Sequence, residues 1–156
     1  MLNAFRFRMR GFSLVEALVA LIVLSIGMLG IAGLHVESLR ASRTALKRTE
    51  AVALASDMAD RIRANRLGRN AYNKELTQTI TAEVACTDTA NCSPPEMAEH
   101  DLAEWQAAVA AALPNGACAV EVDPSTSPIT YRITITWAEP GEEEDSSYEL
   151  VMSAGI

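Results

Sequence analysis

The stretch that decides the fold is Phe12–Leu34, FSLVEALVALIVLSIGMLGIAGL, in which Glu16 is the one charged residue. The hydrocarbon core of a bilayer is about 30 Å thick and is crossed by about 20 helical residues, so this stretch is long enough to span it. A secretory signal peptide has a shorter apolar region of about 7–15 residues, followed by a small-residue cleavage site. Here the run ends at His35 without an A-x-A-like site. The stretch therefore predicts a membrane-spanning helix.

Charge is strongly ordered along the 156-residue chain, whose net charge is −7. Residues 1–11 hold three arginines and no acid, and residues 35–70 hold eight basic and four acidic side chains. Residues 71–156 hold two basic against fifteen acidic side chains. Basic flanks around an apolar stretch are typical of a membrane-anchored chain. The acidic remainder argues against nucleic-acid binding, which needs Lys and Arg to neutralise phosphates.

Two residues at the start of the apolar stretch are unusual for a simple anchor. Glu16 places a carboxylate inside the span, which costs about 2.5–3.5 kcal/mol at a helix centre and less near its end. Gly11 separates the stretch from the basic leader. Cleavage after Gly11 would create an amine on Phe12, four residues before Glu16. That amine and the helix N-terminus would both favour the carboxylate.

The string RMRGFSLVEALVALIVLSIGMLGIAGL, residues 8–34, resembles the N-terminus of type IV pilins and related pseudopilins. The shared pattern is a short basic leader, Gly, Phe, three residues, Glu and a long apolar run. The resemblance implies that a prepilin peptidase cuts between Gly11 and Phe12 and that Phe12 is then N-methylated. It also implies that Glu16 recruits the subunit into the growing filament through the N-terminal amine of a neighbour.

Two later segments, ALASDMADRIRANR at 53–66 and DLAEWQAAVAAALPNG at 101–116, resemble the type IV pilus modification proteins, the PilV-type minor pilins. This resemblance implies a minor pilin that helps to initiate pilus assembly in a priming complex at the start or tip of the fibre. It implies an inner-membrane precursor, held in lipid, with its head outside the cytoplasm. Its partners would be major and minor pilins and the inner-membrane assembly platform. Fibres of this class serve adhesion and twitching motility.

The predicted fold class is α+β, a long helical stem packed on a small antiparallel sheet. Its four parts are a removed leader at 1–11, a transmembrane and filament-core helix at 12–34, an amphipathic continuation of the stem at 35–66 and a globular head at 67–156.

The stem continuation contains no Pro or Gly, and one helical stripe in it is apolar: Ala51, Ala55, Met58 and Ile62. Gly68 and Asn70 are expected to end the helix. Within the span, Gly27, Gly30 and Gly33 are weak points that cost about 1 kcal/mol each relative to Ala. The same small residues would permit close helix packing in lipid. The sequence favours neither interpretation.

Within the head, residues 100–113 predict a helix, and three period-two patterns predict an antiparallel sheet with one buried face. The stem is the expected cover for that face. The residues expected to point inward are Leu102, Trp105, Val109 and Leu113 of the helix, and Cys118, Val120, Val122, Tyr131, Ile133, Ile135, Trp137, Tyr148, Leu150 and Met152 of the strands. A short strand is also expected around Thr77, Thr79, Ile80, Thr81 and Val84, with a loop from Cys86 to Pro95.

The three cysteines would lie outside the cytoplasm, where disulfides persist. All three pairings of Cys86, Cys92 and Cys118 are open, and the short spacing favours Cys86–Cys92. The chain has no C-x₂-C pair, P-loop, G-x-S-x-G or dinucleotide fingerprint. We therefore expect no metal, cofactor or enzymatic activity. The acidic segment Pro140–Asp145 lacks the ligand spacing of a calcium loop and is interpreted as solvated.

Two other functions stay open at this point. A minor pseudopilin of a type II secretion system would share the stem chemistry. An unprocessed membrane-anchored binding protein or enzyme would retain residues 1–11.

Overall fold

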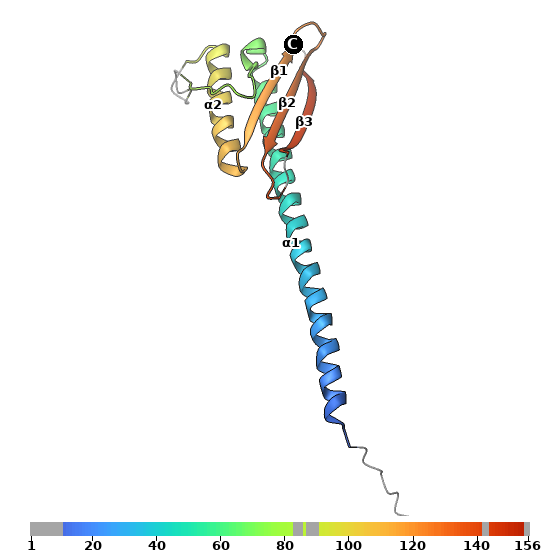
Figure 1. The fold of residues 1–156 in the computed structure, drawn as a ribbon. Helices are drawn as coiled ribbons and strands as arrows, with labels where there is room; N and C mark the ends of the chain where they lie inside the picture. The colour runs from blue at the N-terminus through green and yellow to red at the C-terminus, as the bar shows by residue number, and fades with distance from the viewer. Residues whose placement is uncertain (1–10, 83–85, 87–90, 142–143, 155–156) are drawn as a thin grey trace, which may run out of the picture. The chain divides into compact units, whose positions relative to one another are not determined.

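A computed structural model describes residues 11–82, 86, 91–141 and 144–154 of the chain. The element order is α1 (Leu14–Ala64), the short 3-10 helix η1 (Arg69–Tyr72), α2 (Pro94–Ala112), β1 (Ala117–Asp123), β2 (Ile129–Trp137) and β3 (Ser146–Ala154) (Figure 1). The chain divides between Arg43 and Thr44 into two compact units, which we call the N-terminal unit and the head unit. A long apolar N-terminal helix followed by a small antiparallel sheet confirms the predicted α+β fold.

The 51-residue helix α1 contributes to both units. Its sequence is rich in Ala, Leu and Arg, which are strong helix formers, and it contains no Pro. The helix runs without a break through Gly27, Gly30 and Gly33, so these glycines do not interrupt it. A Cβ at any of them would meet no atom within 4 Å, which leaves each position open to the close approach of a second helix.

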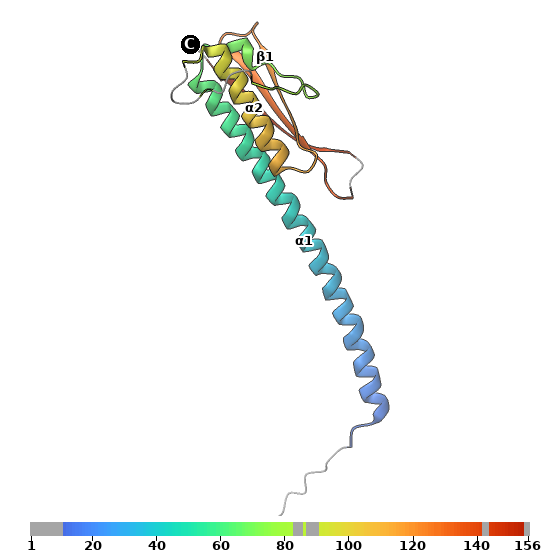
Figure 2. The same cartoon turned by 90° about the vertical axis from the view of Figure 1, so that its left-hand side faces the viewer.

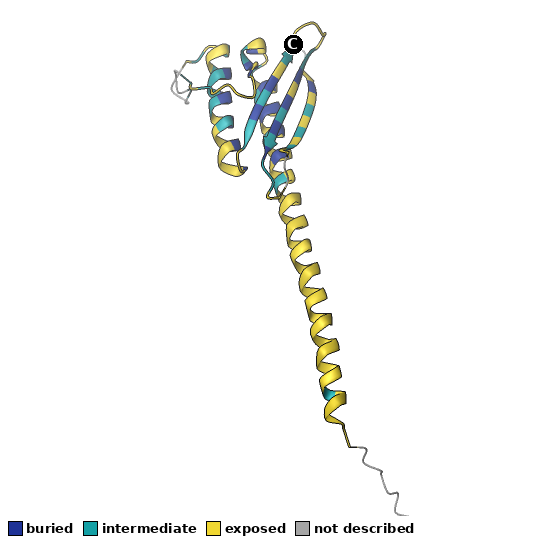
Figure 3. Cartoon of the chain, in the orientation of Figure 1, coloured by how far each residue is buried: buried dark blue, intermediate teal, exposed yellow. Residues whose placement is uncertain are grey.

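One stripe of α1 forms part of the core of the head unit. The predicted residues Ala51, Ala55, Met58 and Ile62 are all buried, and Ala59 joins them. In the N-terminal unit, by contrast, α1 is exposed almost throughout (Figure 3). The same helix is therefore a core element toward its C-terminal end and a bare apolar surface in its first half.

The end of α1 differs in detail from the expectation. The helix ends at Ala64, slightly before Arg66, and Gly68 does not adopt the left-handed conformation of a typical helix stop. Its φ is −66°, and the positive φ of 38° belongs to Arg69. A Cβ at Gly68 would lie 2.7 Å from Asn65 Nδ2 and 2.9 Å from Tyr72 Cε2. Glycine is thus required for the close packing of the Tyr72 ring.

Helix α2 begins at Pro94, so the prediction that it begins at residue 100 is wrong, and Pro94 and Pro95 of the expected loop belong to the helix. A proline in that turn lacks an N–H that would have no helical partner in any case. The Glu96 carboxylate accepts hydrogen bonds from the N–H and the hydroxyl of Ser93, both at 2.7 Å. The sequence Ser93-Pro-Pro-Glu96 matches a capping box, which explains the start of the helix.

The three strands form an antiparallel sheet in the order β1-β2-β3. The register between neighbouring strands is continuous and contains no bulge. The residues predicted to point inward share one face, and those of β2 are all buried. On β3 the same face is less covered, because Tyr148 and Leu150 are only half-buried. Burial therefore decreases across the sheet toward the β3 edge.

Two helices cover the inner face of this sheet. Figure 1 and Figure 2 show α2 beside the C-terminal part of α1, and the core cluster draws residues from both helices, from η1 and from all three strands. Trp105 of α2 is fully buried, and its Nε1 donates to the Leu54 carbonyl of α1 at 2.8 Å. The predicted inward face of α2 is confirmed, since Leu102, Val109 and Leu113 are buried as well.

The strand predicted around residues 77–84 is wrong for residues 77–82, and Val84 lies outside the described residues. The β-type contact in this region lies N-terminal to the predicted strand, where Lys74 forms an isolated antiparallel bridge with Val120 of β1. Ile80 instead donates its N–H to Gln106 Oε1 of α2 at 3.1 Å. This segment therefore leaves the β1 edge after one bridge and runs toward α2.

Thr44 and Glu139 connect the start of the head unit to the loop after β2. Glu139 accepts a hydrogen bond from Thr44 Oγ1 at 2.7 Å on one oxygen and from Trp137 Nε1 at 3.1 Å on the other. The bond from Thr44 is the main cause that lowers the pKa of Glu139 below its ordinary value of 4.5. Ionised Glu139 therefore stabilises the fold above the unfolded-state pKa, and this stabilisation is lost as the pH falls through the folded-state pKa.

We expect Thr44→Val to weaken the acid dependence of stability, measured by urea unfolding of the detergent-solubilised chain from neutral pH to about pH 3. The free energy of unfolding of variant and wild type should differ most above pH 4.5 and converge as Glu139 is protonated. Thr49→Val is the control, because its hydroxyl donates to the Ala45 carbonyl and to no carboxylate. Parallel pH profiles for wild type and Thr44→Val would contradict the role of this bond.

Candidate functional site

The residues of the predicted N-terminal motif lie at the exposed start of α1. Phe12 is 76% exposed, and a Cβ at Gly11 would meet no atom within 4 Å. The first helical hydrogen bond described runs from the Ala17 N–H to the Ser13 carbonyl at 3.2 Å. The peptide bond between Gly11 and Phe12 therefore lies outside the helix and is accessible. Residues 1–10 of the predicted leader lie outside the described residues.

Glu16 lies in the first turn of α1 and is exposed. Its carboxylate forms no ion pair with any residue in the described ranges. A negative charge in the first turn is favoured by the helix dipole by about 0.3–1 kcal/mol at an exposed site. The position is thus electrostatically suited to an anion, and its carboxylate is open to a cation from another molecule.

The apolar surface of the N-terminal unit has no partner within the chain. Within the part of the chain that the structure describes, α1 is the helix long and apolar enough to cross a membrane, and none of its apolar window is buried. Soluble monomers rarely expose apolar patches larger than a few hundred Å². The large side chains exposed along this unit are Phe12, Leu14, Val15, Leu18, Val19, Leu21, Ile22, Val23, Leu24, Ile26, Met28, Leu29, Ile31, Leu34, Val36 and Leu39. Lipid or other apolar helices must cover them.

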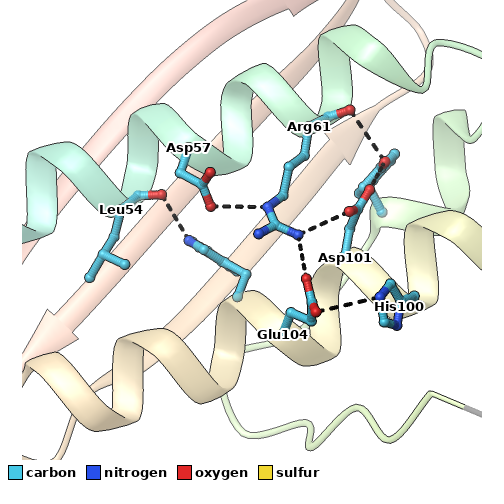
Figure 4. A network of polar contacts seen from close by, with 8 residues as sticks. Leu54, Asp57, Arg61, His100, Asp101 and Glu104 are labelled. Carbon is cyan, nitrogen blue, oxygen red and sulfur yellow. Dashed lines mark hydrogen bonds and ion pairs between the residues drawn. The ribbon is translucent and has the colours of Figure 1, made fainter. Parts of the chain in front are cut away.

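In the head unit, Arg61 is the centre of a polar network between α1 and α2 (Figure 4). Its Nε donates to Asp57 at 3.0 Å, and its Nη1 donates to Asp101 at 3.1 Å and to Glu104 at 3.0 Å. His100 Nε2 lies 3.5 Å from the second oxygen of Glu104. The side chain of Arg61 is 29% exposed and that of Asp101 is 12% exposed, so the pair is only partly hydrated. The network fixes how the two helices are aligned.

The protonation states of this network are strongly biased. Partial burial alone would lower the pKa of Arg61, but hydrogen bonds to Glu104, Asp57 and Asp101 raise it above its usual value. Burial, followed by the hydrogen bond to Asp101 at 2.7 Å, raises the pKa of the Tyr72 hydroxyl. Neither group exchanges a proton near neutral pH. Arg61 and Tyr72 are therefore suited to holding structural elements together rather than to acid–base catalysis.

Comparison with known families separates the chain into two adjoining parts. The family model described as a prokaryotic N-terminal methylation motif matches residues 6–32, and the model described as type IV pilin Tt1218 matches residues 33–103. Together the two matches support a type IV pilin-like family for this chain. No curated protein and no solved structure gives a significant match.

The two matches place the sites of this pilin in different units. The methylation-motif match contains Gly11, Phe12 and Glu16, and the pilin match contains Arg61 and Asp101. A pilin-type protein is a structural subunit. Its N-terminal motif implies processing by a prepilin peptidase and association with other pilins. The motif and the apolar helix together support membrane anchoring and incorporation into a pilus.

The cysteines of this pilin fall into a pair and a buried single thiol. Cys86 and Cys92 are joined by a disulfide with a Cα–Cα distance of 5.9 Å, the pairing that their short spacing favours. Cys118 is buried and does not take part in it. Burial raises the pKa of the Cys118 thiol, although the nearby Lys74 ammonium acts in the opposite direction. A buried thiol held protonated is a poor nucleophile.

No metal site emerges from the described residues, among which no group of three or more His, Cys, Asp or Glu is placed to hold an ion. Residues 142 and 143 of the acidic segment lie outside those ranges. The pocket beside the disulfide has a volume of about 360 Å³ and is lined by residues that include Arg61, Met97 and Asp101. These two charged residues already bind each other.

The Arg61 network gives a direct test of the contact between α1 and α2. Arg61→Met would leave Asp101 partly buried without its cation. Breaking a fully buried ion pair costs about 3–5 kcal/mol, and an exposed pair is worth about 0–1 kcal/mol. For this half-hydrated network we expect a loss of about 2 kcal/mol in the free energy of unfolding, measured in urea on the detergent-solubilised chain.

Arg63→Met is the matched control, because Arg63 pairs with Asp60 on the solvent side of the same helix turn. That pair is exposed, and we expect its removal to cost less than about 1 kcal/mol. Adding Asp101→Asn to Arg61→Met should restore part of the lost stability, since the amide oxygen still accepts from Tyr72 without a buried charge. Equal effects of Arg61→Met and Arg63→Met would show that the network does not hold the helices together.

Proposed function

We propose that this pilin is a PilV-type minor pilin that takes part in initiating type IV pilus assembly, in a priming complex at the start or tip of the fibre. The observation that carries the proposal is the bare apolar surface of the N-terminal unit, directly preceded by the exposed Gly11 and Phe12 of a matched methylation motif. The resemblance of residues 53–66 and 101–116 to type IV pilus modification proteins supports the minor role.

In this proposal a prepilin peptidase hydrolyses the peptide bond between Gly11 and Phe12. Both residues are exposed and precede Leu14, the first residue of α1, so no helical structure protects the bond. One water molecule is consumed: its oxygen becomes part of the new carboxylate of Gly11, and the new amine of Phe12 gains a proton. N-methylation of that amine leaves it basic, so the mature N-terminus is cationic.

Glu16 then provides the polar contact of assembly. An unpaired carboxylate inside hydrocarbon costs about 2.5–3.5 kcal/mol at a helix centre. The cationic N-terminus of a neighbouring pilin offsets this cost when it pairs with Glu16, while the apolar face of α1 packs on other stems. Major and minor pilins and the inner-membrane assembly platform are the partners of this step.

We place the precursor in the inner membrane with the leader in the cytoplasm and the head unit outside. The prepilin-type motif supports this orientation, since Lys and Arg do not decide it: residues 1–11 hold three of them and residues 35–50 hold four. The disulfide between Cys86 and Cys92 agrees with an oxidising compartment. Assembly would transfer the mature chain from lipid to the pilus fibre.

The N-terminus of the mature protein, determined by mass spectrometry of membrane extracts and of sheared pili, tests the proposal. The expected result is a chain in both fractions that begins at N-methylated Phe12. A chain that still carries residues 1–11, in cells with an active prepilin peptidase, would overturn it. A processed chain that is absent from sheared pili but required for protein secretion would instead be a pseudopilin of a type II secretion system.

Glu16→Ala tests the assembly step separately from membrane insertion. We expect the variant to insert normally and its amount in sheared pili to fall at least about tenfold, as when about 1.4 kcal/mol of pairing is lost. Glu37→Ala is the control, because Glu37 lies on the same helix, is 75% exposed and contacts only Arg40 at 3.8 Å. Normal incorporation of Glu16→Ala would exclude the proposed role of this carboxylate.

A further inference from the structure

The β1 edge of the sheet is closed by the chain itself. The backbone of Lys74 exchanges hydrogen bonds with Val120 at 2.8 and 2.9 Å. Asn73 Oδ1 accepts the Val122 N–H at 3.2 Å, and Lys74 Nζ donates to the Cys118 carbonyl at 2.7 Å. The outward backbone groups between Cys118 and Val122 therefore already have partners, and a further strand cannot pair with them.

The β3 edge differs, since no described segment pairs with its outer side (Figure 1). Residues of an antiparallel strand direct their N–H and C=O groups alternately to one side and the other. Val120 directs its groups outward, so its partner Ile133 directs its own groups to β3, where it pairs with Leu150. The open edge of β3 therefore presents the backbone groups of the intervening residues, Ser147, Glu149, Val151 and Ser153.

Most of the usual protections of an edge strand are absent from β3. Natural sheets protect open edges with Pro, Lys, bulges or very short strands. β3 has nine residues, contains no Pro or Lys, and pairs with β2 without a bulge. Its charged residue, Glu149, is bound by Arg132 on the outer face. Val151 on that face is 51% exposed, and Tyr148 and Leu150 on the inner face are half-buried. An added strand would cover side chains on both faces.

We propose that the β3 edge is a docking site for an extended strand of a different pilin-type subunit, which adds to the sheet as a fourth strand. The inference rests on the proposed function, because it takes the partner from the same fibre. Main-chain hydrogen bonds to the four outward residues of β3 give the affinity. Side chains of the added strand that pack on Val151 at the outer face and on Leu150 at the inner face give the selectivity.

The partner strand is neutral or basic. Glu144 and Asp145 precede β3, and Glu149 lies near its middle, so the edge carries acidic groups along its first half. Like charges directly opposite each other on neighbouring strands are destabilising. An acidic segment is therefore disfavoured, and a strand with Lys, Arg or Thr near this acidic half of β3 is favoured.

The partner is not a second copy of this chain. Neighbouring copies along a fibre are related by a screw operation, which makes their contact heterologous. A second copy would then have to offer its other edge, β1, and Asn73 and Lys74 close that edge. Because one edge is open and the other is closed, a different subunit can add one strand to the sheet. Copies of this chain cannot add to one another in a continuous series.

The test uses the full chain in its native membrane, with the photo-crosslinking amino acid p-benzoylphenylalanine placed at Val151. Cross-linked peptides are identified by mass spectrometry. The expected result is an adduct with a predicted strand of another chain whose precursor carries the Gly-Phe-x-x-x-Glu motif near its N-terminus. The control position is Ala107, which is exposed on α2. Absence of an adduct, an adduct with a second copy or with lipid, or the same adduct from both positions would overturn the proposal.

A pair of variants then tests the backbone contact. Val151→Pro removes an outward N–H that β2 does not use, whereas Val151→Ala keeps it. Copurification of the cross-linked subunit should fall at least about tenfold for Val151→Pro and much less for Val151→Ala, which loses only side-chain contact. If Val151→Pro unfolds the head unit, Val151→Lys places a charge at the edge instead and should give the same loss. Unchanged copurification in the folded variants would overturn the proposal.

The same samples separate this inference from the proposed function. Mature chains in sheared pili with no strand adduct would refute the β3 docking site and leave the pilin role intact. Unprocessed chains absent from pili would refute the pilin role itself.

Discussion

Burial of one stripe of α1 against the sheet is the interaction on which the rest of the structure depends. Ala51, Ala55 and Met58 are completely inaccessible to solvent, and the inner face of β2 is buried with them. A small head of this kind buries little core by itself. Without α1 the inner face would be half uncovered, so the stem is part of the head's core as well as its attachment.

Polar contacts then select one alignment of the helices from those that apolar packing would allow. The Trp105 indole reaches the Leu54 carbonyl, and Arg61 connects three carboxylates from two helices. Ion pairs of this kind add less stability than the apolar burial, because desolvation offsets much of their attraction. Their effect is geometric, since a rotation of α2 about its axis would leave Asp101 partly buried without a cation.

Patterns within one element were predictable from the sequence, and contacts between distant elements were not. The stripe on α1 and the alternation in β1 and β2 follow from a fixed period of burial, so the spacing of apolar residues located them. The start of α2 was misplaced because Pro94 and Pro95 favour a loop in most contexts, and only the pairing of Ser93 with Glu96 reverses that preference. The contact between Arg61 and Asp101 joins residues 40 positions apart, and no local pattern indicates it. The buried Lys74 is similar, because its acceptors are backbone carbonyls, which every residue has.

The continuity of α1 also has a mechanical meaning. A pull on the head unit is transmitted through a single helix, whose hydrogen bonds lie in series along its axis. Between the apolar surface near Leu34 and the core residues near Met58 the load is carried by the backbone hydrogen bonds of α1 itself. Tension therefore acts on three features of one continuous helix: its packing on the sheet, its own backbone hydrogen bonds, and the contacts of its apolar surface.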